Sequence, residues 1–152
     1  MTDSQERFEQ LIKHLSDISG HEFPISNNAC TLINETDEVA AIIELPEGSD
    51  LLLFHSMVSR LPSEPEVRYG RALQLLNLNN SPEKLRGAWF AIDGEGFGIH
   101  LMSSSPIYSL SEGQFENLLF NYIQLTEELR QQLTEEELEI SPPLSPFEGL
   151  QV

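Results

Sequence analysis

The sequence predicts an α+β fold in the order α-β-β-β-α-β-β-α, with a mainly antiparallel, twisted sheet packed by helices. Two observations lead to this prediction. Three segments carry apolar residues at helical spacing, and short apolar runs between them are bounded by clusters of glycine, proline, asparagine and aspartate. Strands that follow one another through short turns favour an antiparallel sheet. At 152 residues the chain is long enough for one domain with its own core.

The first predicted helix covers residues 4–19. Its apolar residues from Phe8 to Ile18 recur at the spacing of a single helical stripe, and Gly20 follows as a typical C-terminal stop. The turns after it are rich in charged residues, glycine and proline. Three strands are predicted between these turns, over residues 29–33, 39–45 and 51–58.

The third predicted strand is apolar on both faces. Leu53 and Met57 belong to one face, whereas Leu52 and Phe54 belong to the other. A half-solvated antiparallel strand would instead alternate apolar with polar residues. The strand is therefore either covered twice or exposes an apolar patch, and large exposed patches often mark binding sites.

The middle helix is predicted over residues 63–78, with Ser63 as N-cap and Glu66 completing a capping box. Its apolar residues form two stripes, one of Tyr69, Ala72, Leu73 and Leu76 and the other of Val67, Leu75 and Leu78. A surface helix of a small monomer usually has one stripe. We therefore expect a two-fold homodimer through this helix, the alternative being a helix buried within one domain.

A hairpin is predicted next, with strands over residues 88–92 and 97–102 around Asp93-Gly94. Its glycines lack the spacing of a phosphate-binding loop, and no helix follows them. The serines at 103–105 are interpreted as a loop.

The last predicted helix covers residues 111–133 and begins with a capping box of Ser111 and Gln114. After it, residues 134–152 contain only acidic charge and several prolines. We therefore predict a folded domain over residues 1–133 and a disordered, acidic, proline-containing tail over residues 134–152.

Composition argues against several classes of function. The net charge of −17, from 25 acidic and 8 basic residues, argues against binding to nucleic acid or anionic membranes. Apolar runs such as residues 51–54 are too short for membrane insertion, and the charged N-terminus does not resemble a secretory signal. A single cysteine, Cys30, allows no internal disulfide and suits a reducing cytoplasm.

The residues that usually carry chemistry are scattered. The four histidines lie in different predicted segments, and neither a His-x-x-x-His nor a Cys-x-x-Cys pattern suggests a metal site. The sequence contains no Gly-x-Ser-x-Gly nucleophile elbow. We therefore expect no enzymatic activity and no cofactor.

Three stretches resemble a known family. Residues 73–78 read Leu-Gln-Leu-Leu-Asn-Leu, residues 87–93 read Gly-Ala-Trp-Phe-Ala-Ile-Asp before a glycine-rich hairpin, and residues 8–12 read Phe-x-x-Leu-Ile. This pattern, together with length and acidity, resembles the class I chaperones of bacterial type III secretion, the CesT/SycE-type or Tir chaperone family. The resemblance spans about residues 4–133.

The resemblance implies a cytoplasmic bacterial homodimer without catalytic activity. Such a chaperone binds an extended N-terminal segment of one or more secreted effectors, keeps it soluble and secretion-competent, and delivers it to the secretion apparatus through the ATPase. The bound segment lays apolar side chains into surface grooves and adds a strand to the sheet. The competing hypothesis is a non-catalytic dimeric adaptor that binds a folded partner.

Two sets of residues follow as candidate sites. The dimer interface is predicted to use the first stripe of the middle helix, at Tyr69, Leu73 and Leu76. The effector-binding groove is predicted from apolar residues of the first helix and the strands, namely Phe8, Leu11, Leu32, Ile43, Leu53 and Phe54.

Removing residues 134–152 is predicted to leave the domain folded, because this segment lacks periodic apolar residues and carries strong like charge. The melting temperature of the truncated chain should stay within a few degrees of that of the full chain. A larger fall in thermal denaturation followed by circular dichroism would show that the tail packs on the domain.

Overall fold

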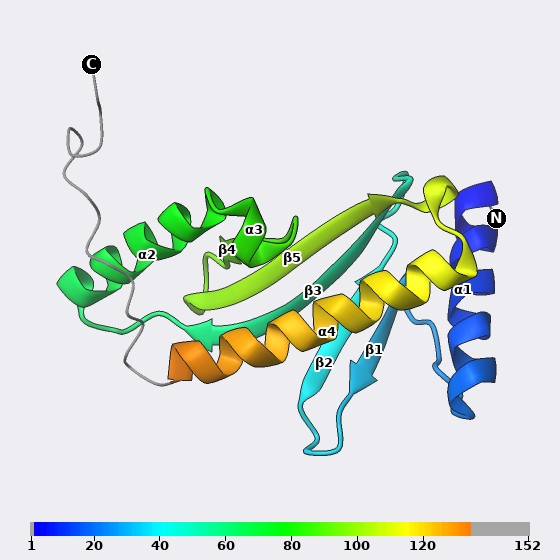
Figure 1. The fold of residues 1–152 in the computed structure, drawn as a ribbon, viewed down its shortest axis with the longest axis horizontal. Helices are drawn as coiled ribbons and strands as arrows, with labels where there is room; N and C mark the ends of the chain where they lie inside the picture. Colours follow the sequence, from blue (N-terminus) through cyan, green and yellow to red (C-terminus); the bar gives the residue numbers. More distant parts are fainter. Residues whose placement is uncertain (1, 135–152) are drawn as a thin grey trace.

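The computed structural model describes residues 2–134 and has the predicted α+β architecture (Figure 1). Its elements are α1 (Asp3–Ser19), β1 (Ala29–Ile33), β2 (Val39–Glu44), β3 (Leu51–Arg60), α2 (Pro65–Asn79), α3 (Pro82–Leu85), β4 (Trp89–Ile92), β5 (Gly98–Pro106), the 3₁₀ turn η1 (Ile107–Ser109) and α4 (Glu112–Thr134). The five strands form one antiparallel sheet in the order β1-β2-β3-β5-β4. From residue 135 on, the predicted tail lies outside the described residues.

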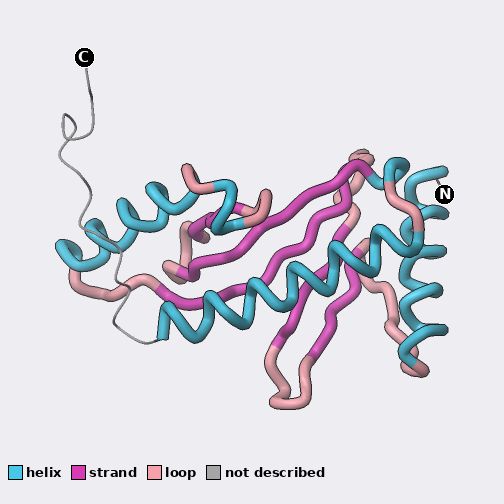
Figure 2. Tube along the Cα trace, viewed as in Figure 1, coloured by secondary structure: helices cyan, strands magenta, loops and turns pink. Residues whose placement is uncertain are grey.

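One face of the sheet is covered and the other is open. Helix α4 runs across the sheet along β3, and α1 lies beside the N-terminal end of α4 (Figures 1 and 2). The β3 residues that face α4, such as Leu52 and Phe54, are buried. Those that alternate with them, Leu53 and Met57, are partly exposed. Of the two arrangements that the sequence allows for this strand, the exposed apolar face is the one adopted.

A buried hydrogen-bond pair joins α4 to the sheet. The Tyr122 hydroxyl donates to the Leu101 carbonyl oxygen at 2.8 Å and lies 2.8 Å from the Ser56 hydroxyl. The Phe54 ring packs on the Tyr122 ring at a centroid distance of 5.6 Å. Burial raises the pKa of the Tyr122 hydroxyl, because the ionised form would lose its hydration. The neutral tyrosine therefore sets where α4 lies on β3 and β5.

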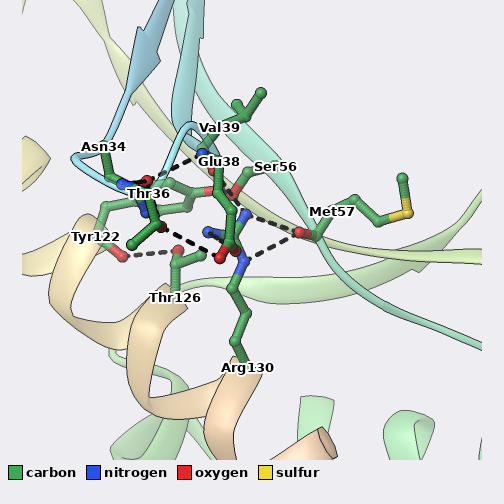
Figure 3. Close-up of polar contacts among 9 residues, drawn as sticks. All are labelled: Asn34, Thr36, Glu38, Val39, Ser56, Met57, Tyr122, Thr126 and Arg130. Carbon is green, nitrogen blue, oxygen red and sulfur yellow. Dashed lines mark hydrogen bonds and ion pairs between the residues drawn. The ribbon is translucent and has the colours of Figure 1, made fainter.

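Arg130 fastens the C-terminal half of α4 to β2 and β3 (Figure 3). Its guanidinium donates to the carbonyl oxygens of Met57, at 2.8 Å, and Val39, at 2.6 Å, and lies 3.9 Å from a Glu38 carboxylate oxygen. Bonds from a cation to backbone carbonyls are stronger than neutral ones. Together with Tyr122 they hold α4 at two points along its length.

The start of α2 differs from the predicted one. Glu64, not Ser63, is the N-cap, and it makes no side-chain capping bond. Pro65 occupies the first helical position, where its missing N–H costs nothing. Glu64, the residue before this proline, is held in an extended conformation. Ser63 therefore lies outside the helix, and the predicted capping box with Glu66 does not form.

The turn of the second hairpin is longer than predicted. The last paired residues, Ile92 and Ile99, leave a loop in which Asp93 accepts hydrogen bonds from the Gly96 and Gly98 N–H groups. These bonds and the His100 side chain hold the pKa of Asp93 at about 2, His100 having the largest effect. A Cβ at Gly98 would lie 2.5 Å from an Asp93 carboxylate oxygen, so a larger residue here would displace the Asp93 side chain.

Strand β5 also continues past the predicted end. Ser103, Ser104 and Ser105, interpreted from the sequence as a loop, pair in register with residues of β3. A serine run has no apolar pattern, and the long partner strand supplies the hydrogen bonds that extend it. The capping box of Ser111 and Gln114 forms as predicted, with bonds of 2.9 and 3.1 Å.

Replacing Tyr122 by phenylalanine should lower the free energy of unfolding by about 1–3 kcal/mol, since the Ser56 hydroxyl and the Leu101 carbonyl would lose a buried partner. Tyr108→Phe is the matched control, because Tyr108 is 59% exposed and should change stability by less than about 0.5 kcal/mol. Urea unfolding of both variants measures the difference. Equal effects would show that the hydroxyl does not hold α4.

Candidate functional site

An apolar groove lies between α1 and α4, with β1 at its floor. Its volume is about 360 Å³. Two of its side chains, Ile18 and Phe120, are 54% and 62% exposed, so the groove carries an apolar patch rather than a single exposed apolar residue. The lining residues are Leu15, Ile18, Phe23, Leu32, Glu116, Asn117, Leu119, Phe120 and Ile123.

Polar contacts beside the groove fix α1 against α4. His14 on α1 lies between two carboxylates of α4, 3.3 Å from Glu112 and in close contact with Glu116. Arg7, about two helical turns before His14, donates to the Leu110 carbonyl oxygen at 2.8 Å. Gly20 then ends α1 with a φ of 73°, a left-handed conformation that favours glycine. The groove is therefore held open by contacts outside its apolar lining.

The edge of the sheet beside this groove is open. Strand β1 is an edge strand, and its first residue, Ala29, is paired with Ser26 through hydrogen bonds of 2.9 and 3.0 Å. Peptide groups alternate in direction along an antiparallel strand, so the N–H and C=O of Thr31 also point away from β2. Within residues 2–134 nothing pairs with them. An extended segment could therefore add to β1 at Thr31 while its side chains enter the groove over Leu32.

The structure corrects the predicted groove set. Phe8, Leu11, Ile43 and Phe54 are at most 5% exposed and build the core. Phe8 and Leu11 lie on the buried side of α1, and Ile43 and Phe54 lie on the sheet face that the helices cover. Leu32 does line the groove, at its floor, with 8% of its surface exposed. Leu53 lies on the open face of the sheet and is half-buried.

Sequence reasoning missed the most exposed residues of the groove, Ile18 and Phe120. Ile18 continues the core stripe of α1, and no pattern separates it from the buried members of that stripe. Phe120 does carry a signal, because it lies beside Leu119 but outside the inner stripe of α4. A large aromatic residue off the buried stripe of an amphipathic helix has no core to enter in its own chain.

The predicted dimer stripe is exposed in the single chain. Tyr69, Leu73 and Leu76 are 68%, 37% and 62% exposed. The opposite side of α2 packs on the domain through Leu75, which is 1% exposed, and through the partly buried Leu78. In Figure 1, α2 projects beyond the end of β3. The helix thus presents an apolar stripe that the rest of residues 2–134 does not cover.

The titratable groups form separate pairs. His55 lies 2.8 Å from Glu44 on adjacent strands, and His100 lies 2.9 Å from Asp93 in the second hairpin. Cys30 is buried, which raises the pKa of its thiol and disfavours the reactive thiolate. Among residues 2–134 no group of three histidine, cysteine or acidic side chains is arranged so that it could hold a metal ion, and no helix is long and apolar enough to span a membrane.

Comparison with solved structures places the fold. One chain of the HopA1–SchA chaperone–effector complex matches with a TM-score of 0.69 and 14% identity, over 86% of this chain and 98% of that one. The Yersinia pestis type III secretion chaperone SycH, solved with a fragment of YscM2, matches with a TM-score of 0.58 and 16% identity, over 80% and 98%. YbjN from E. coli, described as a putative transcription regulator, matches with a TM-score of 0.60 and 18% identity, over 84% and 92%.

At these identities the structures establish a shared fold only. A search of functionally curated proteins found no significant match. The family comparison is more specific, because one family model covers residues 10–130 and so includes the C-terminal part of α1, the whole sheet, α2 and most of α4. The chain therefore belongs to the Tir chaperone protein (CesT) family.

Proposed function

We propose that this protein is a cytoplasmic chaperone of bacterial type III secretion. It binds an N-terminal segment of one or more secreted effectors in extended form and keeps that segment soluble and ready for export. Delivery to the secretion apparatus, through its ATPase, completes the proposed role. Family membership supports this function, as do two solved structures that share the fold, a chaperone–effector complex and a type III secretion chaperone.

The observation that carries the proposal is the open edge of β1 beside an apolar groove. Backbone hydrogen bonds at an edge strand accept almost any extended sequence, while a groove selects apolar side chains at alternate positions. A folded partner would present few free backbone groups to such an edge. The arrangement thus favours an unfolded segment over the surface of a folded protein, and binding over catalysis.

The proposal includes a homodimer through α2. The uncovered stripe of Tyr69, Leu73 and Leu76 supports it, since an apolar helix face that its own chain leaves in water gains free energy when a second copy covers it. A two-fold dimer would also supply two grooves for one bound effector, which raises the effective affinity without any new contact.

Phe120→Asp should weaken effector binding about tenfold or more and leave the fold intact. The side chain is 62% exposed, so its loss costs little in the free chain, whereas a bound apolar residue would lose its contact and meet a charge. Phe54→Asp, by contrast, should unfold the domain. The partner is found by co-expressing the chain with secreted proteins of its bacterium, and binding is measured by calorimetry.

Asn121→Asp is the matched control, because it adds the same charge at an exposed neighbouring position outside the groove. Protease digestion of the complex should leave a protected, extended effector segment. A partner that binds only when folded, or a Phe120→Asp variant that binds normally, would favour the adaptor function instead.

Leu76→Arg should convert the dimer to a folded monomer, since the charge would be buried without a partner at the interface but is solvated in the single chain. Asn77→Arg, on an exposed residue one position along α2, should remain dimeric. Light scattering after gel filtration gives both masses. A monomeric wild type, or a dimeric Leu76→Arg, would place the interface elsewhere.

A further inference from the structure

The two edges of the sheet are not equivalent. Strand β1 forms one edge and β4 the other. An open edge pairs with any extended chain that reaches it, so a protein that holds unfolded segments must control both of its edges. The contacts at β4 show that this second edge is closed by a side chain.

Asn79, the last residue of α2, pairs with the backbone of β4. The Phe90 N–H donates to the Asn79 side-chain oxygen at 2.7 Å, and the Asn79 side-chain nitrogen donates to the Phe90 carbonyl oxygen at 3.1 Å. A carboxamide carries one acceptor and one donor group side by side, as a peptide group does. The side chain therefore occupies both positions that a neighbouring strand would use at Phe90.

These two bonds lie on the outer side of β4. The strand pairs with β5 from Trp89 to Ile92, and a residue whose N–H and C=O both bind Asn79 must direct them away from β5. The next outward N–H toward the N-terminus, that of Ala88, donates to the Leu85 carbonyl oxygen at 2.8 Å. In a strand of four residues this leaves the outward groups of Ile92, next to the hairpin turn, as the remaining backbone to which another chain can pair.

We propose that Asn79 closes the β4 edge and so restricts strand addition to β1, which makes it a residue that determines where an extended partner segment docks. Ser26 covers only the first residue of β1, and Thr31 stays available. Asn79 acts as a positioning residue through Phe90 and need not contact the partner. The inference rests on the proposed function, because it assumes that extended segments add to this sheet.

The test maps where a probe strand binds. The probe is a short synthetic peptide of alternating valine and threonine between lysine ends, with a photo-reactive benzophenone, used at physiological salt to limit charge-driven binding. On the wild-type protein the cross-links should fall at β1 and spare β4. Asn79→Ala should add cross-links at β4 and raise the bound peptide per protomer about twofold. Asn80→Ala should not, because the exposed Asn80 side chain makes no hydrogen bond to the residues that the structure describes.

Thr31→Pro closes the other edge without touching Asn79. Proline removes the outward N–H of Thr31 and is tolerated on an edge strand, and Thr31→Val keeps the N–H as a control. If β4 is closed, Thr31→Pro should lose essentially all probe binding. The double variant with Asn79→Ala should recover binding at β4 alone. The single variant Thr31→Pro keeps Asn79 intact and so remains informative if Asn79→Ala fails to fold.

The outcomes separate the two proposals. Suppose that the probe binds at β1 of the wild type. The role of Asn79 is then overturned if Asn79→Ala shows no gain at β4, or if Thr31→Pro retains binding. Either result leaves the proposed function standing. No probe at β1 of the wild type, but binding at β4 of Asn79→Ala, overturns strand addition at β1 and supports the closure by Asn79. Wild-type cross-links at β4 overturn the closure directly.

Discussion

The packing of α4 along β3 is the contact on which the rest of the structure depends. It buries Leu52 and Phe54, and two polar anchors, Tyr122 and Arg130, fix its position along the strand. Because a helix covers a sheet on one side only, this arrangement leaves the opposite face and both edges to be managed separately. The surfaces assigned to function all arise from what α4 does not cover.

The groove is a consequence of how α1 meets α4. Polar contacts from Arg7 and His14 hold α1 at a set position, and the apolar side chains of Ile18 and Phe120 both line the groove between the two helices. A fully apolar contact between the helices would have collapsed to native packing density. The cost of this exposure is tolerated where a partner chain later covers it.

The two edges of the sheet differ in how far their backbone groups are already paired. The β4 edge is occupied by the Asn79 carboxamide and the β1 edge is covered only at Ala29. Helix α2 thereby has separate surfaces for separate tasks: its end closes β4, Leu75 packs on the domain, and its exposed stripe is available to a second copy.

Local pattern in the sequence was enough to identify most elements. The spacing in α1, the strand β1 and the capping box of Ser111 and Gln114 were predictable, because each depends on residues within a few positions of one another. The exposure of Leu76 and Tyr69 opposite the buried Leu75 likewise agrees with the two stripes read along α2.

What the sequence alone determined is therefore the order of elements, the α+β class, the two-sided character of α2 and the family. Only the tertiary structure decided that Phe8, Ile43 and Phe54 are core while Ile18 and Phe120 line a groove. It also decided that Asn79 reaches Phe90, eleven residues later. The physical reason is that periodicity shows which residues share a face, whereas burial and edge pairing depend on which distant element covers that face.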